Sequence, residues 1–145
     1  MGNYIKEIVR RYTLKYNTRN PFKLAELLGI EIQLGTPGCD GCYMFLKNHR
    51  YIFLDQNLNG SELLQVMAHE LGHAILHKKQ NCYFIRNKTF LLNSKTEMEA
   101  NLFAAELLID NDIILEHPEY TICQLSRLLG YEEKLVELWT QNRTN

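Results

Sequence analysis

The chain has 145 residues, of which 46% are hydrophobic, a length that suits one hydrophobic core and is short for two. We therefore expect a single domain over residues 1–145, with a small helical part at about 120–145. The net charge of −1, from 16 basic and 17 acidic residues, excludes a general electrostatic attraction to nucleic acid or to anionic membranes. No apolar segment is long enough for a signal-peptide core or a membrane span, so we expect a cytoplasmic protein.

The chain should begin with two helices. Apolar residues at helical spacing predict an amphipathic helix over about residues 2–17. Asn20 followed by Pro21 is typical of a helix start, and the short helix 22–28 that it begins should end at Gly29.

A small sheet should follow these helices. Alternating apolar and polar residues predict a strand at 30–34. Beyond a glycine-rich turn, the apolar runs 42–46 and 51–54 are joined by residues 47–50 as a hairpin. The simplest arrangement of the three strands is a small antiparallel sheet.

Four cysteines could form two disulfides, but a chain of this size without a secretion signal favours reduced thiols. Cys39 and Cys42 form a CxxC pair, whereas Cys82 and Cys123 are isolated. A structural zinc site would need a second close pair. The sequence therefore predicts free thiols in a glycine-rich turn and leaves open whether Cys39 and Cys42 have a role.

Residues 60–77 should form a buried helix, because apolar side chains cover most of its circumference. Asn59 can cap this helix, with Glu62 completing a capping box. The segment 78–93 that follows has no clear pattern and could be a second hairpin or a loop folded over the site.

This helix carries an HExxH motif, His69-Glu70-Leu71-Gly72-His73. Residues four apart share a helix face, so His69 and His73 can direct two imidazole nitrogens at one metal ion. Glu70 lies beside them and is suited to act as the general base on a metal-activated water. The motif can also occur by chance in a surface helix, but buried histidines and a buried glutamate need partners, which a metal supplies.

The next helix, at about 94–110, offers a third ligand. Glu97 shares a face with small residues that allow another helix to approach, whereas Lys95, Glu99 and Glu106 should lie on a solvated face. We therefore expect Glu97 to be the third metal ligand. The alternative is that Glu97 is a first-turn glutamate favoured only by the helix dipole.

The sequence around the motif bears on further ligands and on residues that could support the ligands. The longer HExxHxxGxxH pattern is rejected, because Leu76 and Lys79 stand where it needs Gly and His. His77 continues the histidine row but lies about 12 Å along the axis from His69, which favours a rim or core position. Asn101, one turn beyond Glu97, is a candidate hydrogen-bond partner of a ligand histidine.

The C-terminal part should form two short amphipathic helices around Gly130 and Tyr131. A helix, a glycine turn and a helix resemble a helix-turn-helix, but basic residues are sparse, with Arg127 and Lys134 the main candidates. Packing or partner docking is therefore expected here, and direct nucleic-acid binding is not.

Two segments together closely resemble the ImmA/IrrE family of zinc metallopeptidases: AHELGHAILH at 68–77 and EMEANLFAAELL at 97–108. The resemblance covers nearly the whole chain, and its short form is similar to members encoded by prophages and integrative elements. It implies an α+β, zincin-like fold, in which a small antiparallel sheet packs on helices that include the HExxH active-site helix. One departure is Ile109-Asp110, where many members have Met-Pro.

By this resemblance, one Zn²⁺ is held by His69, His73 and Glu97, and Glu70 is the catalytic glutamate. Family members cleave helix-turn-helix repressors, which relieves repression of mobile-element or stress genes. The resemblance thus implies a repressor protein as the substrate. The same ligands could also hold manganese, iron or cobalt.

The residue that stabilises the oxyanion is left open. Tyr43, His77, Tyr83 and Arg86 are possible substrate or oxyanion contacts, and the sequence does not choose among them. Two other functions also stay open: an antirepressor that binds and sequesters the repressor without cutting it, and a plain structural zinc domain.

Overall fold

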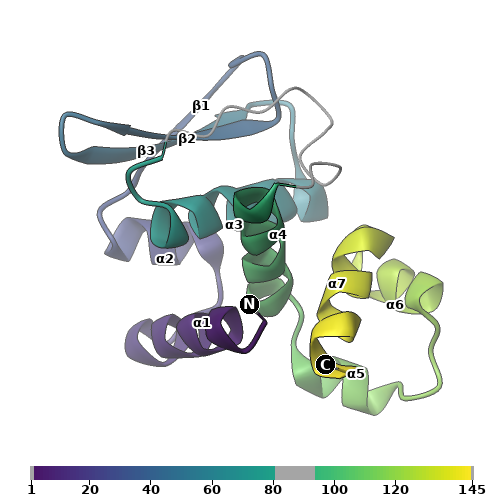
Figure 1. The fold of residues 1–145 in the computed structure, drawn as a ribbon. Helices are drawn as coiled ribbons and strands as arrows, with labels where there is room; N and C mark the ends of the chain where they lie inside the picture. The colour runs from purple at the N-terminus through teal and green to yellow at the C-terminus, as the bar shows by residue number, and fades with distance from the viewer. Residues whose placement is uncertain (1, 81–93, 145) are drawn as a thin grey trace.

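The computed structural model describes residues 2–80 and 94–144 of the chain (Figure 1). In chain order the elements are α1 (Gly2–Tyr16), α2 (Pro21–Leu27), β1 (Glu31–Gly35), β2 (Gly41–Leu46), β3 (His49–Asp55), α3 (Gly60–Leu76), α4 (Lys95–Leu108), α5 (Asn111–Glu116), α6 (Ile122–Leu129) and α7 (Glu133–Thr144). The helices and the small sheet confirm the predicted α+β, zincin-like class. The short helix α5 was not predicted.

The structure confirms the predicted capping hydrogen bond at α2 but not the one at α3. The side chain of Asn20 caps α2, where its Oδ1 accepts a hydrogen bond from the Phe22 amide at 2.9 Å. Asn59 occupies the predicted N-cap position of α3, but the predicted capping hydrogen bond is wrong, because the Asn59 side chain makes none. Gly60, with φ of 57°, stands between Asn59 and the first regular turn.

The three strands form a mixed sheet in the order β1-β3-β2. β2 and β3 pair antiparallel through a two-residue turn, in which Lys47 and Asn48 both have positive φ, so this hairpin is confirmed. The prediction of an antiparallel sheet is wrong for β1, which pairs parallel with β3. The loop after β1 crosses to the far edge of the sheet. Both of its ends are tied to the end of β3, because the Asp55 amide donates to Asp40 and the Gln56 amide donates to Gly35.

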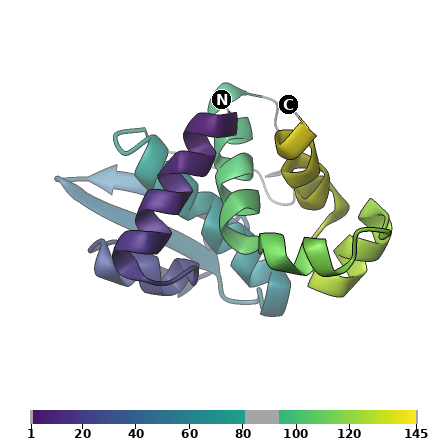
Figure 2. The same cartoon turned by 90° about the horizontal axis from the view of Figure 1, so that it is seen from below.

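The elements stack in layers, with the sheet on α3, α3 on α4, and α1 and α7 against α4 (Figure 1). Figure 2 shows α1 lying beside α4 from below. The core between these layers contains large, fully buried side chains: Tyr43, Ile52, Leu54, Met67, Leu71, Phe103, Leu107, Ile5 and Leu135. None of the described helices is long and apolar enough to cross a membrane.

The sequence predicted that Glu99 and Glu106 lie on a solvated face of α4. This is wrong for Glu106 and only partly right for Glu99. Glu106 is only 3% exposed and pairs with Arg143 of α7. The Glu99 side chain is 15% exposed and contacts His77. Helical phase alone did not predict this, because α4 is covered on several sides by α3, α1 and α7.

Candidate metal centre

His69 and His73 lie fully buried on the face of α3 that packs against α4. Their Nε2 atoms are 3.2 Å apart, which confirms that the two imidazoles converge as the motif predicted. Residues 65–74 of α3 are all buried, so the helix lies within the core.

Glu97 reaches the two histidines from the first turn of α4. Ser94 caps this helix by accepting a hydrogen bond from the Glu97 amide at 3.3 Å, which sets the start of the turn. Glu97 Oε2 lies 2.9 Å from His69 Nε2, and Oε1 lies 3.1 Å from His73 Nε2. The three residues are the only such group found in residues 2–80 and 94–144, with ligand atoms within 4.8 Å of one another.

This geometry fits a divalent metal ion. Two ligands at 2.0–2.1 Å from a tetrahedral Zn²⁺ are separated by about 3.3 Å. The distances between the two imidazole nitrogens and from them to the Glu97 carboxylate, 2.9–3.2 Å, are close to this value. Two histidines and one glutamate are also the protein ligands of zinc sites that keep one position open for catalysis.

The charge at Glu97 is stabilised by its neighbours. Burial alone would raise the pKa of this carboxyl, but hydrogen bonds with His69 and His73 outweigh burial and lower its pKa from 4.5 to about 2. Burial lowers the pKa of His73 in spite of the nearby carboxylate. An ionised carboxylate beside a neutral imidazole is the protonation state that metal binding needs.

Glu70 is fully buried beside this group. Within the described residues, neither of its carboxylate oxygens has a hydrogen-bond partner. Burial, and then the charge of Glu97, raise the pKa of Glu70 well above 4.5. Because buried polar atoms are rarely left without partners, this carboxyl is suited to hold a water or a substrate group at the centre.

His69 and His73 each make a further contact through the other ring nitrogen, Nδ1. His69 Nδ1 lies 2.7 Å from Asn101 Oδ1, so Asn101 stands where the sequence predicted. His73 Nδ1 lies 3.1 Å from His77 Nδ1, and His77 Nε2 lies 3.2 Å from Glu99 Oε1. The contact between His77 and Glu99 was missed, although the regular row of three histidines could have suggested that His77 supports His73.

Of the four residues predicted as possible substrate or oxyanion contacts, the structure describes two, Tyr43 and His77. Tyr43 is fully buried, and its hydroxyl donates to the carbonyl of Lys78 just beyond α3. Tyr83 and Arg86 lie outside the described residues, so their roles stay predictions. Both ring nitrogens of His77 already contact protein groups.

Cys39 and Cys42 are buried thiols near the start of β2 and form no disulfide. Burial, together with the nearby Cys39 and Glu70, raises the pKa of the Cys42 thiol from 9.0 to about 12. A thiol with so high a pKa is a poor nucleophile and a poor metal ligand at neutral pH. The prediction of free thiols is thus confirmed for Cys39 and Cys42.

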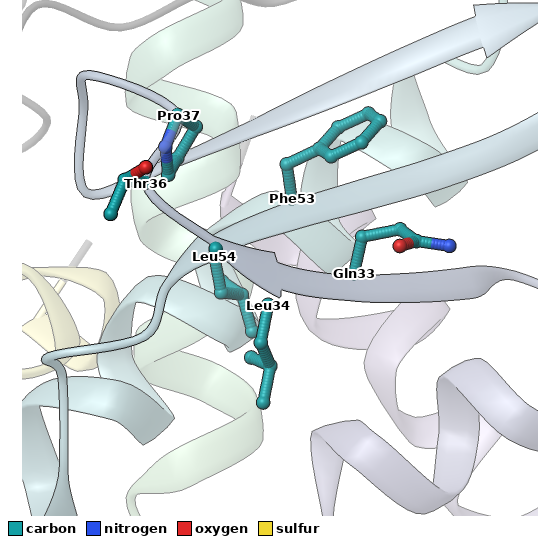
Figure 3. A pocket seen from close by; sticks show the side chains of 7 residues that line it. Gln33, Leu34, Thr36, Pro37, Phe53 and Leu54 are labelled. Carbon is teal, nitrogen blue, oxygen red and sulfur yellow. The ribbon is translucent and has the colours of Figure 1, made fainter.

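A surface pocket lies at the other edge of the sheet, where β1 ends (Figure 3). Gln33 and Phe53 stand side by side there on neighbouring strands. The lining contains no acid, base or charged side chain: Gln33, Leu34, Gly35, Thr36, Pro37, Phe53 and Leu54. None of these residues belongs to the group formed by His69, His73 and Glu97, so the pocket is not part of the metal centre.

Comparison with known proteins agrees with this centre. Residues 25–137 match the model of the IrrE N-terminal-like domain, a range that contains every residue of the metal group. The chain is 35% identical over 138 residues to uncharacterized immunity region protein 2 of Bacillus phage phi105, covering 92% of this chain and 87% of that protein. It is 30% identical over 119 residues to the metallopeptidase ImmA of Bacillus subtilis strain 168, covering 80% and 69% of the two chains. The chain therefore belongs to the ImmA/IrrE family of metallopeptidases.

Proposed function

We propose that this protein is a zinc-dependent endopeptidase that cleaves a helix-turn-helix repressor and so relieves repression of mobile-element or stress genes. The observation that carries the proposal is the buried Glu70 carboxyl, which has no hydrogen-bond partner among the described residues and lies close enough to Glu97 for the charge of Glu97 to raise its pKa. The name of the phage relative, an immunity region protein, supports a link to prophage repression. A repressor substrate would place the reaction in the cytoplasm.

His69, His73 and Glu97 would hold the metal ion. Zinc bound there would act as a Lewis acid, which would polarise the peptide carbonyl and lower the pKa of a water molecule. Asn101 orients His69 through the hydrogen bond between Nδ1 and Oδ1.

Glu70 moves the proton in the reaction. It accepts a proton from the attacking water as the water oxygen bonds to the carbonyl carbon of the scissile peptide. When the bond between carbon and nitrogen breaks, Glu70 passes this proton to the leaving amine. A carboxyl whose pKa is raised by burial is well matched to both halves of this transfer.

The substrate would bind as an extended strand along β2. In the strand order β1-β3-β2, β2 is an edge strand, and its first residue, Gly41, adjoins Glu70. Main-chain hydrogen bonds to an edge strand hold a peptide regardless of its side chains. The scissile bond would thereby be presented to Glu70.

The test is the intact mass of the repressor encoded beside this gene, after co-expression with wild type, Glu70→Gln or Glu97→Ala. We expect two fragments with wild type alone, whose masses locate the cleaved bond. Glu70→Gln should bind zinc and the repressor but leave the repressor whole. A repressor that stays intact and co-purifies with wild type would instead support antirepression by binding, and cleavage by Glu70→Gln would overturn the role of Glu70.

A further inference from the structure

The two histidines of the metal centre are supported in different ways. His69 Nδ1 contacts an amide oxygen, that of Asn101, at 2.7 Å. His73 Nδ1 instead contacts a second imidazole nitrogen, Nδ1 of His77, at 3.1 Å, and His77 in turn contacts the Glu99 carboxylate at 3.2 Å. His77 is 9% exposed and the Glu99 side chain 15%, so both groups are largely removed from water.

The order of protons along this row follows from the site itself. If His73 binds the metal through Nε2, its single proton must be on Nδ1, which then donates to His77. His77 Nδ1 must therefore be the acceptor and carry no proton. The one proton of His77 is then on Nε2, from which it is donated to Glu99 Oε1.

We propose that His77 and Glu99 are positioning residues that fix the tautomer and the ring orientation of His73. Glu99 accepts the last hydrogen bond of the row, at the end farthest from the metal. In each hydrogen bond of the row, the donor is therefore the residue nearer to the metal. A carboxylate at that end also raises the basicity of His73 Nε2, which strengthens the bond to a cation. This inference rests on the proposed zinc site.

The arrangement comes from the contact between α3 and α4. His77 is the C-cap residue of α3, and the spacing of four residues brings it next to His73 on the same face. Glu99 comes from the same first part of α4 that supplies Glu97, so one helix provides both a metal ligand and the end of the row. A different explanation is that His77 and Glu99 merely satisfy each other as buried polar groups. That explanation predicts no effect on the metal.

Zinc affinity separates these explanations. The apparent dissociation constant for Zn²⁺ is measured by competition with a chelating dye for wild type, Glu99→Ala, Glu99→Gln and Met98→Ala. We expect about tenfold weaker binding for Glu99→Ala, since groups that support a ligand histidine typically affect affinity by 10- to 100-fold. Glu99→Gln should recover part of the loss, because its amide oxygen still accepts from His77. Met98, which is 41% exposed on the same helix, is the matched control and should bind zinc like wild type.

A second measurement uses only the wild-type protein and so does not depend on the folding of a variant. Long-range ¹H–¹⁵N spectra of the zinc-loaded protein report which ring nitrogen of each histidine carries the proton. We expect His73 to be protonated on Nδ1 and His77 on Nε2. Protonation of His77 on Nδ1 would overturn the inference, as would unchanged zinc affinity in Glu99→Ala. A failure of the zinc site itself is distinct from both, because Glu97→Ala would then bind zinc like wild type.

Discussion

Gly41 of β2 packs directly against Glu70 of α3, and a side chain added at Gly41 would force its neighbours on α3 to shift. A Cβ atom placed on Gly41 would lie 3.3 Å from Glu70 Cγ and only 2.8 Å from Val66 Cγ1. Gly41 is not among the glycines with positive φ, so the close approach of the strand, and not the backbone conformation, requires glycine here. The absence of a side chain at Gly41 therefore allows the edge strand to approach Glu70 closely.

Replacing Gly41 with alanine should reduce catalysis more than it reduces zinc binding. Overpacking of this kind typically costs about 1–3 kcal/mol of folding free energy. Because the added methyl group pushes on Glu70 and Val66, kcat should fall by about 10- to 100-fold. The histidines face α4 and should keep their positions. Peptidase assays and zinc titrations of Gly41→Ala provide the measurement.

The matched control is Gly35→Ala, because a Cβ on Gly35 meets no atom within 4 Å and its φ is not positive. This variant should retain wild-type kcat and stability. Equal kcat values for the two alanine variants would show that contact with Gly41 does not position Glu70.

Gly72, within the HExxH motif, should also be sensitive to substitution by alanine. Here the property that changes should be the affinity for zinc. Its added Cβ would lie 3.2 Å from both Cα and the carbonyl oxygen of Ala100, which are rigid backbone atoms. The gain in helix propensity on Gly72→Ala, about 1 kcal/mol, roughly offsets the packing strain, so the fold should survive. Separation of α3 from α4 moves the histidines away from Glu97, and zinc affinity should fall about tenfold. Competition with a chelating dye measures this, and unchanged affinity in a folded variant would contradict it.

The sequence predicted the arrangement of His69, His73 and Glu97 well, because the key relationships among these residues are local or periodic. His69, Glu70 and His73 lie within five consecutive residues of one helix, where spacing determines direction. Helical phase was also sufficient to choose Glu97 over Glu99 as the residue that faces both histidines. Each of these inferences needed only the geometry of a single helix.

Features that depend on tertiary packing were predicted less well. The strand order depends on how the loop after β1 is tied to Asp55 and Gln56, which no pattern in the strands reveals. Glu106 has the helical phase of a solvated residue, yet α7 covers it and supplies Arg143. The contact between His77 and Glu99 joins two helices whose relative height is set by packing.

Asn101 should contribute to zinc affinity through His69. Its Oδ1 accepts from His69 Nδ1 at 2.7 Å, which fixes the imidazole with Nε2 toward the metal group. Asn101→Ala should weaken zinc binding by about 10- to 100-fold. Asn101→Asp keeps an acceptor oxygen and should retain tighter binding than the alanine variant. Titration with zinc against a chelating dye provides the ranking, and equal affinities for the two variants would contradict the orienting role.

Loss of Arg143 should destabilise the fold without removing the metal centre. Its guanidinium donates to both oxygens of the buried Glu106 carboxylate, at 2.6 and 3.0 Å, and lies 3.6 Å over the Trp139 ring. Removing one partner of a buried ion pair leaves an uncompensated charge, which typically costs 3–5 kcal/mol. For Arg143→Ala we expect the lower end, about 3 kcal/mol, because the Arg143 side chain is 22% exposed.

Urea unfolding of Arg143→Ala, measured with excess zinc and with a chelator, tests this prediction. Lys134→Ala is the matched control on the same helix, since Lys134 and Glu137 are 4.0 Å apart and both largely exposed. It should leave the unfolding midpoint unchanged. The double variant Glu106→Gln/Arg143→Ala should recover part of the lost stability, because it leaves no buried charge without a partner. If the double variant were less stable than Arg143→Ala, packing of Arg143 on Trp139, and not its charge, would be what anchors α7 to α4.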